Sequence, residues 1–352
     1  MQKQGLNRFC QPGMGEKPWA DQGSALRAAL GPEMKVVMDG FLPAEHARRK
    51  TLKAPIGCVG IGLHSGRRIS LTLHPAAAGA GIQFRRTDLG VDIPARFDFV
   101  TDTRLCTTIA APTAPQARIG TIEHIMAALA GAGIDDAIIE VDGPEIPILD
   151  GSAAPFLFLI DCAGITTSAA PRQIIEVLRP VRVEDGRGAF AELHPNAELA
   201  FDAALEIDYP NTAIGHQSLN FRLSPEAFRA ALADSRTFGL SEDVARLHEA
   251  GLALGGSLDN AVVVDGMAIL NPGGLRHADE FIRHKMLDVV GDLALAGAPL
   301  RARFIGSRSG HGLNNQLLRA LFADPTAWRW VGGAAMRGQG AALAKQKAPA
   351  LV

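Results

Sequence analysis

The sequence lacks the features that place a protein across or outside a membrane. No segment of the 352 residues offers the roughly 18 uninterrupted apolar residues of a spanning helix. Residues 1–21 are polar and interrupted by proline and glycine, so they lack the apolar core of a secretory signal peptide. We therefore expect a cytoplasmic protein with no membrane span.

Cysteine is scarce, and its spacing excludes two kinds of framework. The four cysteines stand far apart and form no Cys-x-x-Cys pair. Neither a disulfide-stapled fold nor a cysteine zinc knuckle is therefore expected.

An excess of one charge is also absent. Lys and Arg number 35 against 37 Asp and Glu, which gives a formal net charge of −2. Such a chain offers no strong positive field for a nucleic acid backbone, so nucleic-acid binding is not expected. The remaining composition, with 47% hydrophobic and 20% charged residues, is ordinary for a globular protein, and the length suggests two domains.

Composition divides the chain into four parts. Residues 1–48 mix glycine, proline and charge without periodicity and are predicted to be a flexible extension. The segment Thr-Thr-Ser-Ala-Ala-Pro-Arg at 166–172 is the best linker candidate, which predicts one domain over 49–168, a second over 173–335 and a tail over 336–352. Strands and helices follow one another without a regular βαβ rhythm, so the predicted fold class is α+β.

Residue patterns predict the main elements. Strands are predicted over 68–74, 137–141, 174–183 and 198–208, and helices over 121–130, 153–163, 225–233, 278–296 and 314–322. Phe156 and Phe158 are expected in the core. The glycine-rich run at 57–66 lacks the lysine of a P-loop and leads into a strand, so that phosphate-binding motif is rejected.

Two short patterns carry candidate ligands on helices. Glu123 and His124 stand near the start of the helix predicted over 121–130. His284, Asp288 and Asp292 recur every four residues and so share one stripe of a later helix. Two ligands at i and i+4 are well placed to hold one metal ion. Taken singly, each pattern is more commonly a solvated charged face.

Taken together, the patterns suggest a catalytic metal. His124, His284 and Asp288 supply three nitrogen and oxygen ligands, and three protein ligands with an open position are typical of catalytic zinc. Glu123, next to a ligand in sequence, could take a proton from a zinc-activated water. The same donors also accept iron, so the sequence leaves the metal in the cell open. Spacing permits the two helices to meet but does not show that they do.

Two loop motifs add candidate groups. His311 lies between glycines in Ser-Gly-His-Gly-Leu-Asn-Asn, on turned backbone just before the last predicted helix. A histidine there can act as a general acid or as a cation near developing charge. Thr237, in Ser-Arg-Thr-Phe-Gly, could hold an oxyanion with its hydroxyl. For each motif taken alone, an ordinary loop is the more common interpretation.

Six stretches occur in an order and spacing that make chance a poor explanation. They are GIGLHSGRRISLTLHPA (60–76), TIEHIMAALAGAGIDDAIIEVDGPEIPILDGSAAPF (121–156), SRTFGL (235–240), GLALGGSLDNAVVVD (251–265), DEFIRHKMLDVVGDL (279–293) and SGHGLNN (309–315). Together they resemble the UDP-3-O-acyl-N-acetylglucosamine deacetylases over about residues 51–330.

The resemblance implies the metal centre residue by residue. It implies one Zn2+ per chain, held by His124, His284 and Asp288. Glu123 matches the base that activates the zinc water, and His311 matches a general acid or electrostatic stabiliser.

Other positions match groups around that centre. Asp292 corresponds to the carboxylate that orients the histidine, and Thr237 to the hydroxyl near the oxyanion. The positions that match substrate contacts are Lys285, Phe238, His64, Asp208, Tyr209 and Arg308. The family stacks uracil on an aromatic residue, and the resemblance points less securely to Asp208 and Tyr209 for that position. Arg308 stands where the family has lysine, which keeps the charge but alters phosphate geometry.

The implied fold is two similar α+β domains, each a sheet layered with helices, facing each other across the active site. A small βαβ insert in the second domain, here about 239–268, would form a tunnel for the fatty acyl chain. Apolar residues that could line it are Val244, Leu247, Leu254, Val262 and Val263. Ordinary core packing is the alternative for each of them. Residues 1–48 have no counterpart in a typical member.

The implied activity is hydrolysis of the N-acetyl group of UDP-3-O-acyl-N-acetylglucosamine, giving UDP-3-O-acyl-glucosamine and acetate, the committed step of lipid A biosynthesis. A different zinc amidase or peptidase could use the same ligands. The absence of His-Glu-x-x-His argues weakly against a peptidase. A non-catalytic UDP-sugar or metal-binding protein would not need Glu123. Left open are the acyl chain length, the role of residues 1–48, whether Glu123 or His311 protonates the leaving amine, and the oligomeric state, with which a monomer is compatible.

Overall fold

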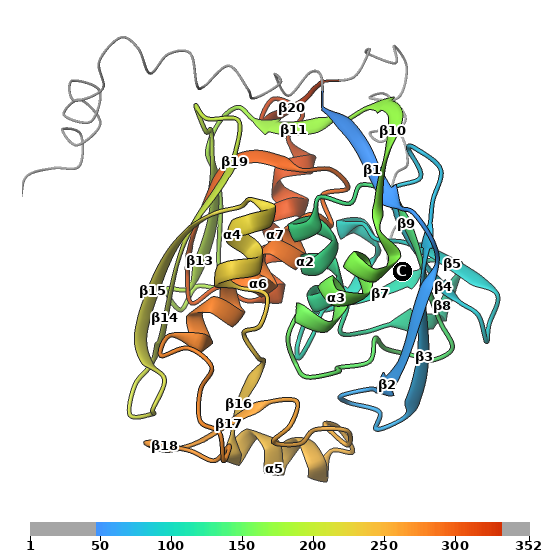
Figure 1. Cartoon of the computed structure of the whole chain (residues 1–352). Helices are drawn as coiled ribbons and strands as arrows, with labels where there is room; N and C mark the ends of the chain where they lie inside the picture. The colour runs from blue at the N-terminus through green and yellow to red at the C-terminus, as the bar shows by residue number, and fades with distance from the viewer. Residues whose placement is uncertain (1–46, 333–352) are drawn as a thin grey trace, which may run out of the picture. The chain divides into compact units, whose positions relative to one another are not determined.

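Two larger sheets flank a central group of helices in the computed structural model, which describes residues 47–332 (Figure 1). The predicted flexible extension, apart from its last two residues, and the predicted tail lie outside the described residues. Helices and strands are mixed without a repeating βαβ order, so the fold is α+β, as the sequence predicted. The described residues belong to one compact unit, and the predicted division near residue 170 stays a prediction.

The first sheet is built from the N-terminal half of the chain. Its order is β2 (Ile56–Ile61), β3 (Arg68–Pro75), β9 (Ala137–Val141), β4 (Ile82–Arg86) and β5 (Val91–Pro94). Alternation along β3 buries Ile69, Leu71 and Leu73, which is why this strand could be predicted from its period of two. A separate small sheet contains β6 (Val100–Asp102), β7 (Thr108–Ala111) and β8 (Ala114–Ile119), preceded by a short 3-10 helix, η5 (Phe97–Phe99).

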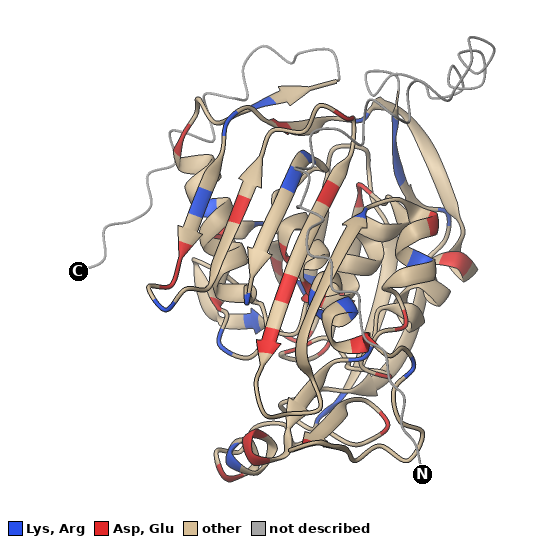
Figure 2. Cartoon of the chain, turned by 90° about the vertical axis from the view of Figure 1, so that its left-hand side faces the viewer, with Lys and Arg blue, Asp and Glu red and all other residues tan. Residues whose placement is uncertain are grey.

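The second sheet is built from the C-terminal half. Its strands are β12 (Val181–Glu184), β13 (Phe190–His194), β19 (Leu300–Ser307), β11 (Ile174–Val177), β20 (Trp328–Val331), β14 (Phe201–Tyr209) and β15 (Gly215–Arg222). Figure 2 shows Lys and Arg interspersed with Asp and Glu along its strands. Arg222 pairs with Asp202 at 2.6 Å on this face. The outer face is therefore a solvated surface, and the helices cover the other face.

Five helices fill the space between the sheets. They are α2 (Glu123–Ala132), α3 (Ala154–Ala163), α4 (Pro225–Ala231), α6 (Glu280–Ala294) and α7 (His311–Ala323). Helix α2 ends at Gly133, which adopts the left-handed conformation with φ of 74°. Helix α4 begins at Ser224, whose hydroxyl accepts a hydrogen bond from the Ala227 N–H at 3.1 Å. Helix α2 therefore ends two residues after the predicted end at 130, and helix α4 begins at the predicted residue 225.

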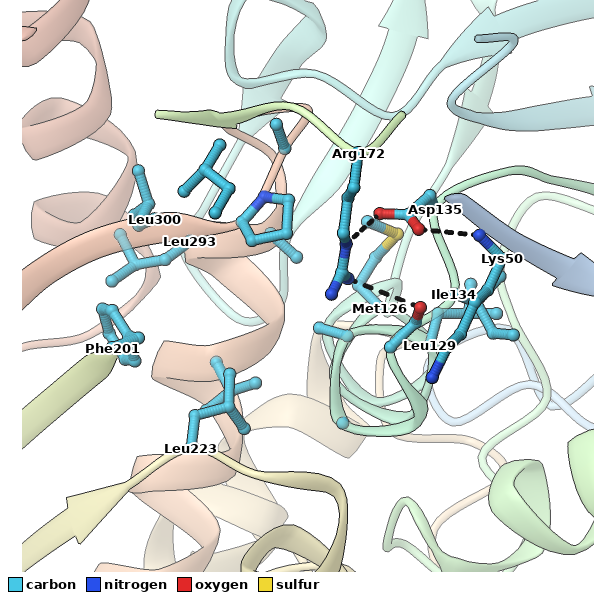
Figure 3. A pocket seen from close by; sticks show the side chains of 18 of the residues that line it. Lys50, Met126, Leu129, Ile134, Asp135, Arg172, Phe201, Leu223, Leu293 and Leu300 are labelled. Atoms are coloured by element: carbon cyan, nitrogen blue, oxygen red, sulfur yellow. Dashed lines mark hydrogen bonds and ion pairs between the residues drawn. The ribbon is translucent and has the colours of Figure 1, made fainter. Parts of the chain in front are cut away.

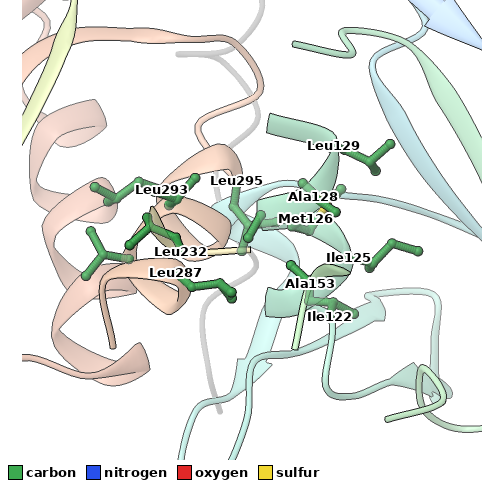
Figure 4. Close-up of a cluster of buried hydrophobic side chains, with 14 of the residues drawn as sticks. Ile122, Ile125, Met126, Ala128, Leu129, Ala153, Leu232, Leu287, Leu293 and Leu295 are labelled. Atoms are coloured by element: carbon green, nitrogen blue, oxygen red, sulfur yellow. The ribbon is translucent and has the colours of Figure 1, made fainter. Parts of the chain in front are cut away.

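Helices α2 and α6 pack against each other through apolar side chains (Figure 4). Residues in this cluster include Ile122, Ile125, Met126, Leu129, Leu287, Leu293 and Leu295, all nearly or fully buried. Each such side chain contributes about 1.5–3 kcal/mol relative to an exposed one. Helix α6 is buried on its polar stripe as well as its apolar one, so His284, Asp288 and Asp292 do not face solvent.

Gly291 lets α6 approach the first turn of α2 closely. A Cβ atom at this position would lie 2.1 Å from the Glu123 carbonyl oxygen. Gly291→Ala is therefore expected to lower the free energy of unfolding by about 1–3 kcal/mol, because backbone overlap outweighs the gain of about 1 kcal/mol in helix propensity. Chemical denaturation measures this difference. Gly273→Ala, which meets no atom within 4 Å, is the control, and a more stable Gly291→Ala protein would contradict the close approach.

A small βαβ unit interrupts the second half between α4 and α6. It contains β16 (Phe238–Leu240), α5 (Ser241–Glu249), β17 (Val262–Asp265) and β18 (Ala268–Ile269), with β16 and β17 parallel. Its position agrees with the insert predicted over about 239–268. Among the predicted tunnel residues, Val262 is buried, Val244, Leu247 and Val263 are half-buried, and Leu254 is 56% exposed. No helix within residues 47–332 combines the length and apolarity that a membrane crossing requires.

Three predictions about local structure were wrong. Most of the proposed linker at 166–172 lies in strand β10 (Ile165–Pro171), which pairs antiparallel with β1 (Arg48–Leu52). Phe158 is 67% exposed, because the apolar run of α3 is longer than its buried face. The predicted strand 174–183 is two strands, with a break at 178–180 before Val181.

Candidate metal centre and active site

The two central helices bring their polar residues together. Glu123 and His124 are the first two residues of α2, at the helix end where the dipole favours a carboxylate. His284 and Asp288 lie on α6, which packs against α2. All four residues are at most 4% exposed. The helices therefore meet, which the sequence alone permitted but did not show.

Three of these side chains form a candidate metal site. One ligand atom from each of His124, His284 and Asp288 lies within 4.8 Å of the other two. His124 Nε2 is 3.8 Å and His284 Nε2 is 3.4 Å from Asp288 Oδ1. The cluster therefore presents two imidazole nitrogens and one carboxylate oxygen to a common point.

Two observations fit a metal ion at this point. Asp288 Oδ1 is buried and has no hydrogen-bond partner among residues 47–332, a situation that is rare for buried polar atoms. His284 Nδ1 donates to the Ser235 carbonyl at 3.0 Å, which leaves a lone pair on Nε2, the atom nearer Asp288. The donor set suits a divalent metal such as zinc or iron.

The surroundings keep these donors in metal-binding protonation states. Burial, and then the neighbouring His284, lower the pKa of His124 to about 3. Burial also lowers the pKa of His284. Burial alone would favour neutral Asp288, but Lys285 and the adjacent histidines outweigh it and hold the pKa of that carboxyl below its usual range. A metal can therefore bind near neutral pH without first displacing protons.

Removal of Asp288 should release the metal. Asp288→Ala is expected to weaken metal binding at least about 100-fold, because loss of groups that merely support a ligand already costs about 10- to 100-fold. Metal content after gel filtration, measured by mass spectrometry, checks this. The exposed Asp259→Ala is the control. Equal metal content in Asp288→Ala and the wild type would remove Asp288 from the ligand set.

Glu123 occupies a shielded position beside the ligands. Burial raises its pKa to about 7; Asp288 and Asp292 add to the rise, and His311 opposes it. The Thr107 backbone N–H donates to Glu123 Oε2 at 3.0 Å. A carboxylate whose pKa lies near neutrality is suited to accept a proton and to release it again.

His311 lies beside Glu123 and is the first residue of α7. The sequence placed it on a loop before a helix starting at 314, so the helix begins three residues earlier than predicted. His311 Nδ1 donates to Asp292 Oδ2 at 2.8 Å, and Nε2 is 3.8 Å from Glu123 Oε1. Burial lowers the pKa of His311, but Asp292 and Glu123 outweigh it and raise the pKa to about 9. The imidazole is therefore a cation at pH 7.

Comparison with known proteins identifies the family of this chain. The LpxC family model, described as UDP-3-O-acyl N-acetylglycosamine deacetylase, matches residues 49–323. A protein of Idiomarina loihiensis named UDP-3-O-acyl-N-acetylglucosamine deacetylase is 48% identical over 286 residues, 81% of this chain and 92% of its own length. A Vibrio cholerae protein of the same name is 49% identical over 285 residues, 80% of this chain and 92% of its own. The chain belongs to the LpxC family.

A cavity of about 150 Å³ opens onto the candidate metal ligands of this LpxC-family protein. Its lining includes ten of the thirteen predicted site residues. They are Glu123, His311, Thr237, Lys285, Phe238, His64, Tyr209, His124, His284 and Asp288. Asp292 does not line the cavity but lies behind His311, where it accepts that ring's N–H.

Asp208 and Arg308 lie outside this cavity. Asp208 is exposed on β14, where strand alternation turns its side chain away from that of Tyr209. Arg308 is exposed after β19; its N–H donates to the Glu206 carbonyl at 2.8 Å, and its guanidinium donates to the Arg187 carbonyl at 3.4 Å. Their roles as substrate contacts stay predictions.

Thr237 and Phe238 form one wall of the cavity. The Thr237 N–H donates to the Gly151 carbonyl, and its own carbonyl accepts from the Val262 N–H, both at 2.8 Å. These bonds fix the backbone that carries the Thr237 hydroxyl. The centroid of the Phe238 ring lies 5.8 Å from that of Tyr209 and 6.3 Å from that of His284, both in edge-to-face geometry. Hydrogen bonds therefore hold the Thr237 backbone, and the Phe238 ring contacts two other rings of the cavity lining.

Lys285 and His64 supply two different polar groups to the cavity. Lys285 Nζ is 2.8 Å from Asp288 Oδ2. Burial opposes its charge, but Asp288 and the other acidic groups nearby together outweigh burial and raise the pKa of Lys285. Both His64 ring nitrogens are buried without a partner among residues 47–332. Burial lowers the pKa of His64, with Glu145 opposing, so its ring is neutral at pH 7. A bound molecule can therefore meet a fixed cation and a free imidazole.

Four further cavity residues were not among the predicted site residues. They are Leu63, Leu105, Cys106 and Thr121. Burial, with Glu123 adding, raises the pKa of the Cys106 thiol to about 12, so the thiol stays protonated. Its proximity to the metal ligands could not be read from its isolated position in the sequence.

Two further residues missed by the sequence analysis hold the carboxylate of Asp292. The Asn314 amide donates to Asp292 Oδ2 at 2.8 Å, and the Thr107 hydroxyl donates to Oδ1 at 2.6 Å. Asn314 lies one helical turn after His311, so its spacing could have suggested a shared partner. Thr107 lies in the first half of the chain, and its sequence context gives no such hint.

A larger cavity, about 280 Å³, is lined by the C-terminal parts of α2 and α6 (Figure 3). In Figure 3, Phe201, Leu223, Leu293 and Leu300 lie on one side, and Leu129, Ile134, Asp135 and Arg172 on the other. Arg172 pairs with Asp135 at 2.7 Å. None of the predicted ligands or catalytic residues lines this space, so the smaller cavity is the candidate active site.

Proposed function

We propose that this LpxC-family protein hydrolyses the N-acetyl group of UDP-3-O-acyl-N-acetylglucosamine in the cytoplasm, giving UDP-3-O-acyl-glucosamine and acetate, the committed step of lipid A biosynthesis. One observation carries the proposal to this chain. The buried Glu123, with a pKa of about 7, stands directly beside a His-His-Asp cluster whose Asp288 oxygen is unpartnered. A binding protein would need the cluster but not the base.

The proposed metal is one zinc ion per chain. Zinc is commonly held by imidazole and carboxylate in catalytic sites with three protein ligands, as at His124, His284 and Asp288. When bound, the metal would activate a water molecule and polarise the acetamide carbonyl. Iron accepts the same donors, so metal analysis of the protein from cells decides between them.

The side chains of this site can perform the proton transfers of amide hydrolysis. Water adds to the acetamide carbon and the C–N bond breaks, so one proton must leave the water and one must reach the amine. We propose that Glu123 takes the water proton, because its carboxylate has a pKa near neutrality. Either Glu123 or protonated His311, whose Nε2 is 3.8 Å from Glu123 Oε1, can then supply the amine proton. Asp292 holds the His311 ring in place.

The remaining cavity residues suit the substrate's other groups. Thr237, whose backbone is held at both N–H and carbonyl, would direct its hydroxyl to the developing oxyanion. Lys285 is a cation at the cavity wall, and His64 offers unpaired ring nitrogens for sugar or phosphate oxygens. Phe238 and Tyr209 would contact apolar or ring surfaces of the substrate. Asp208 and Arg308 would act further out, towards the nucleotide.

A substrate panel after metal exchange tests this proposal. Metal-free protein should be inactive on UDP-3-O-acyl-N-acetylglucosamine and regain activity with one equivalent of zinc. UDP-N-acetylglucosamine without the acyl chain and an N-acetylated peptide should be turned over far more slowly. Zinc-dependent release of acetate from the peptide at the faster rate would instead indicate a different amidase. Absence of activity on every compound despite bound zinc would refute the enzyme assignment.

A further inference from the structure

Thr107 contacts both sides of the catalytic machinery through different atoms. It is 2% exposed and stands directly before β7, in the N-terminal half of the chain. Its N–H donates to Glu123 Oε2 at 3.0 Å, and its hydroxyl donates to Asp292 Oδ1 at 2.6 Å. Its carbonyl accepts from the Ile122 N–H at 3.4 Å, at the start of α2. All three hydrogen-bonding groups of this residue are therefore used at the site.

These contacts close a ring of interactions around the proton-transfer groups. From Thr107 the ring passes to Asp292, then to His311 through its Nδ1 at 2.8 Å, and then across 3.8 Å to Glu123. The Thr107 N–H closes it on the other Glu123 oxygen. The members come from the loop before β7, α6, α7 and α2, which share no local sequence. One residue thus links the two carboxylates.

The hydroxyl has no substitute within the described residues. Asp292 accepts three hydrogen bonds there: His311 and Asn314 share Oδ2, and Thr107 alone donates to Oδ1. A buried carboxylate oxygen without a donor is costly, so loss of the hydroxyl would turn or displace the carboxylate. His311 would follow, because its ring orientation depends on that carboxylate.

We propose that Thr107 is the positioning residue that sets the distance between Glu123 and the Asp292–His311 pair. This inference rests on the proposed function, in which those groups transfer the protons. Thr107 does not need to touch the substrate, and its hydroxyl acts through Asp292. The chemistry of the side chain, not its volume, carries the role.

Substitutions at residue 107 separate these properties. Thr107→Val keeps the shape and the N–H but removes the hydroxyl, and is expected to lower kcat about 10- to 100-fold, with KM and bound metal nearly unchanged. Thr107→Ser restores the hydroxyl and should return kcat to within about threefold of the wild type. Thr87→Val, which removes a hydroxyl bonded to the Val141 carbonyl at the surface, is the matched control.

A double variant tests the route of the effect. If the hydroxyl acts through Asp292 and His311, Thr107→Val should cost less than about threefold in an His311→Ala background. Thermal denaturation checks folding, and Thr107→Ala replaces the valine variant if that protein does not fold. Turnover of Thr107→Val within about twofold of the wild type, equal damage by valine and serine, or full additivity with His311→Ala would each overturn the inference.

Nuclear magnetic resonance reads the same positioning without substrate. The signal of the His311 Nδ1 proton bonded to Asp292 should be retained in Thr107→Ser and shifted or lost in Thr107→Val. An unchanged signal in Thr107→Val would overturn the inference even if the wild type proved inactive. Wild-type inactivity on UDP-3-O-acyl-N-acetylglucosamine would by contrast refute the proposed function, so the two failures can be told apart.

Discussion

Glu123→Gln is expected to lower kcat by about 10²- to 10⁴-fold while the metal stays bound. Glutamine keeps the size of the side chain, and its carbonyl oxygen can still accept the Thr107 N–H that now bonds Oε2. It cannot take a proton from water, which is the role proposed for Glu123. The adjacent His124 and the other ligands are unchanged, so metal content should equal that of the wild type. Initial rates of acetate release and metal analysis of the same samples measure both quantities.

The matched control for this substitution is Glu226→Gln, an exposed residue in the first turn of α4. It makes the same chemical change outside the cavity and should leave turnover unaltered. A Glu123→Gln protein that turns over at the wild-type rate would show that another group takes the proton. A variant that loses its metal would place Glu123 among the groups that hold the ion.

The helices that carry the candidate metal ligands could be predicted because their signals are local. The apolar spacing of α2 and its glycine end, together with the four-residue recurrence of His284, Asp288 and Asp292, fix both the helices and the shared stripe. Residues four apart lie on one side of an α-helix, so the shared stripe follows once the helix is assigned. Burial of the stripe could not be predicted, because it depends on α2 covering it. The close approach of α2 depends in turn on Gly291.

Elements whose identity depends on distant partners were predicted less well. The segment at 166–172 is rich in small and polar residues and resembles a linker, but β1 from more than a hundred residues earlier converts most of it into a strand. Thr107 escaped notice for the same reason, since its hydroxyl meets Asp292, 185 residues away. Asp208 and Arg308 lie outside the cavity. Side chains alternate between the two faces of a strand, and the direction of the chain after a strand varies, so these two features decide where each side chain points.

Burial of this site also shifts the pKa values of Glu123 and His311. Glu123 and His311 are both shielded from solvent, and burial raises the pKa of Glu123. At His311 burial lowers the pKa, but Asp292 and Glu123 outweigh it. The pKa of Glu123 therefore rises to about 7 and that of His311 to about 9. Between these values the carboxylate is ionised and the imidazole is protonated, which is the pair of states that a base and an acid need.

His311→Ala is expected to lower kcat about 100-fold and leave the metal in place, because loss of one stabilising donor in such a site commonly costs about 10²- to 10³-fold. The pH profile should change with it. In the wild type, kcat/KM rises as Glu123 loses its proton and falls as His311 loses its own, near the pKa values of about 7 and about 9. The positive charge of a bound metal favours the carboxylate and the neutral imidazole, so both limbs should lie at or below these values.

The alkaline limb is the part of the profile that identifies His311. Loss of the alkaline limb in His311→Ala, with the acidic limb retained, would assign the alkaline limb to this imidazole. No other member of the ring of interactions loses a stabilising positive charge at alkaline pH. His216→Ala, at an exposed position on β15, removes a histidine outside the cavity and should keep both limbs. An His311→Ala protein that keeps the falling limb at the same pH would assign it elsewhere, with Lys285, the other cation of the cavity, as the group to test next.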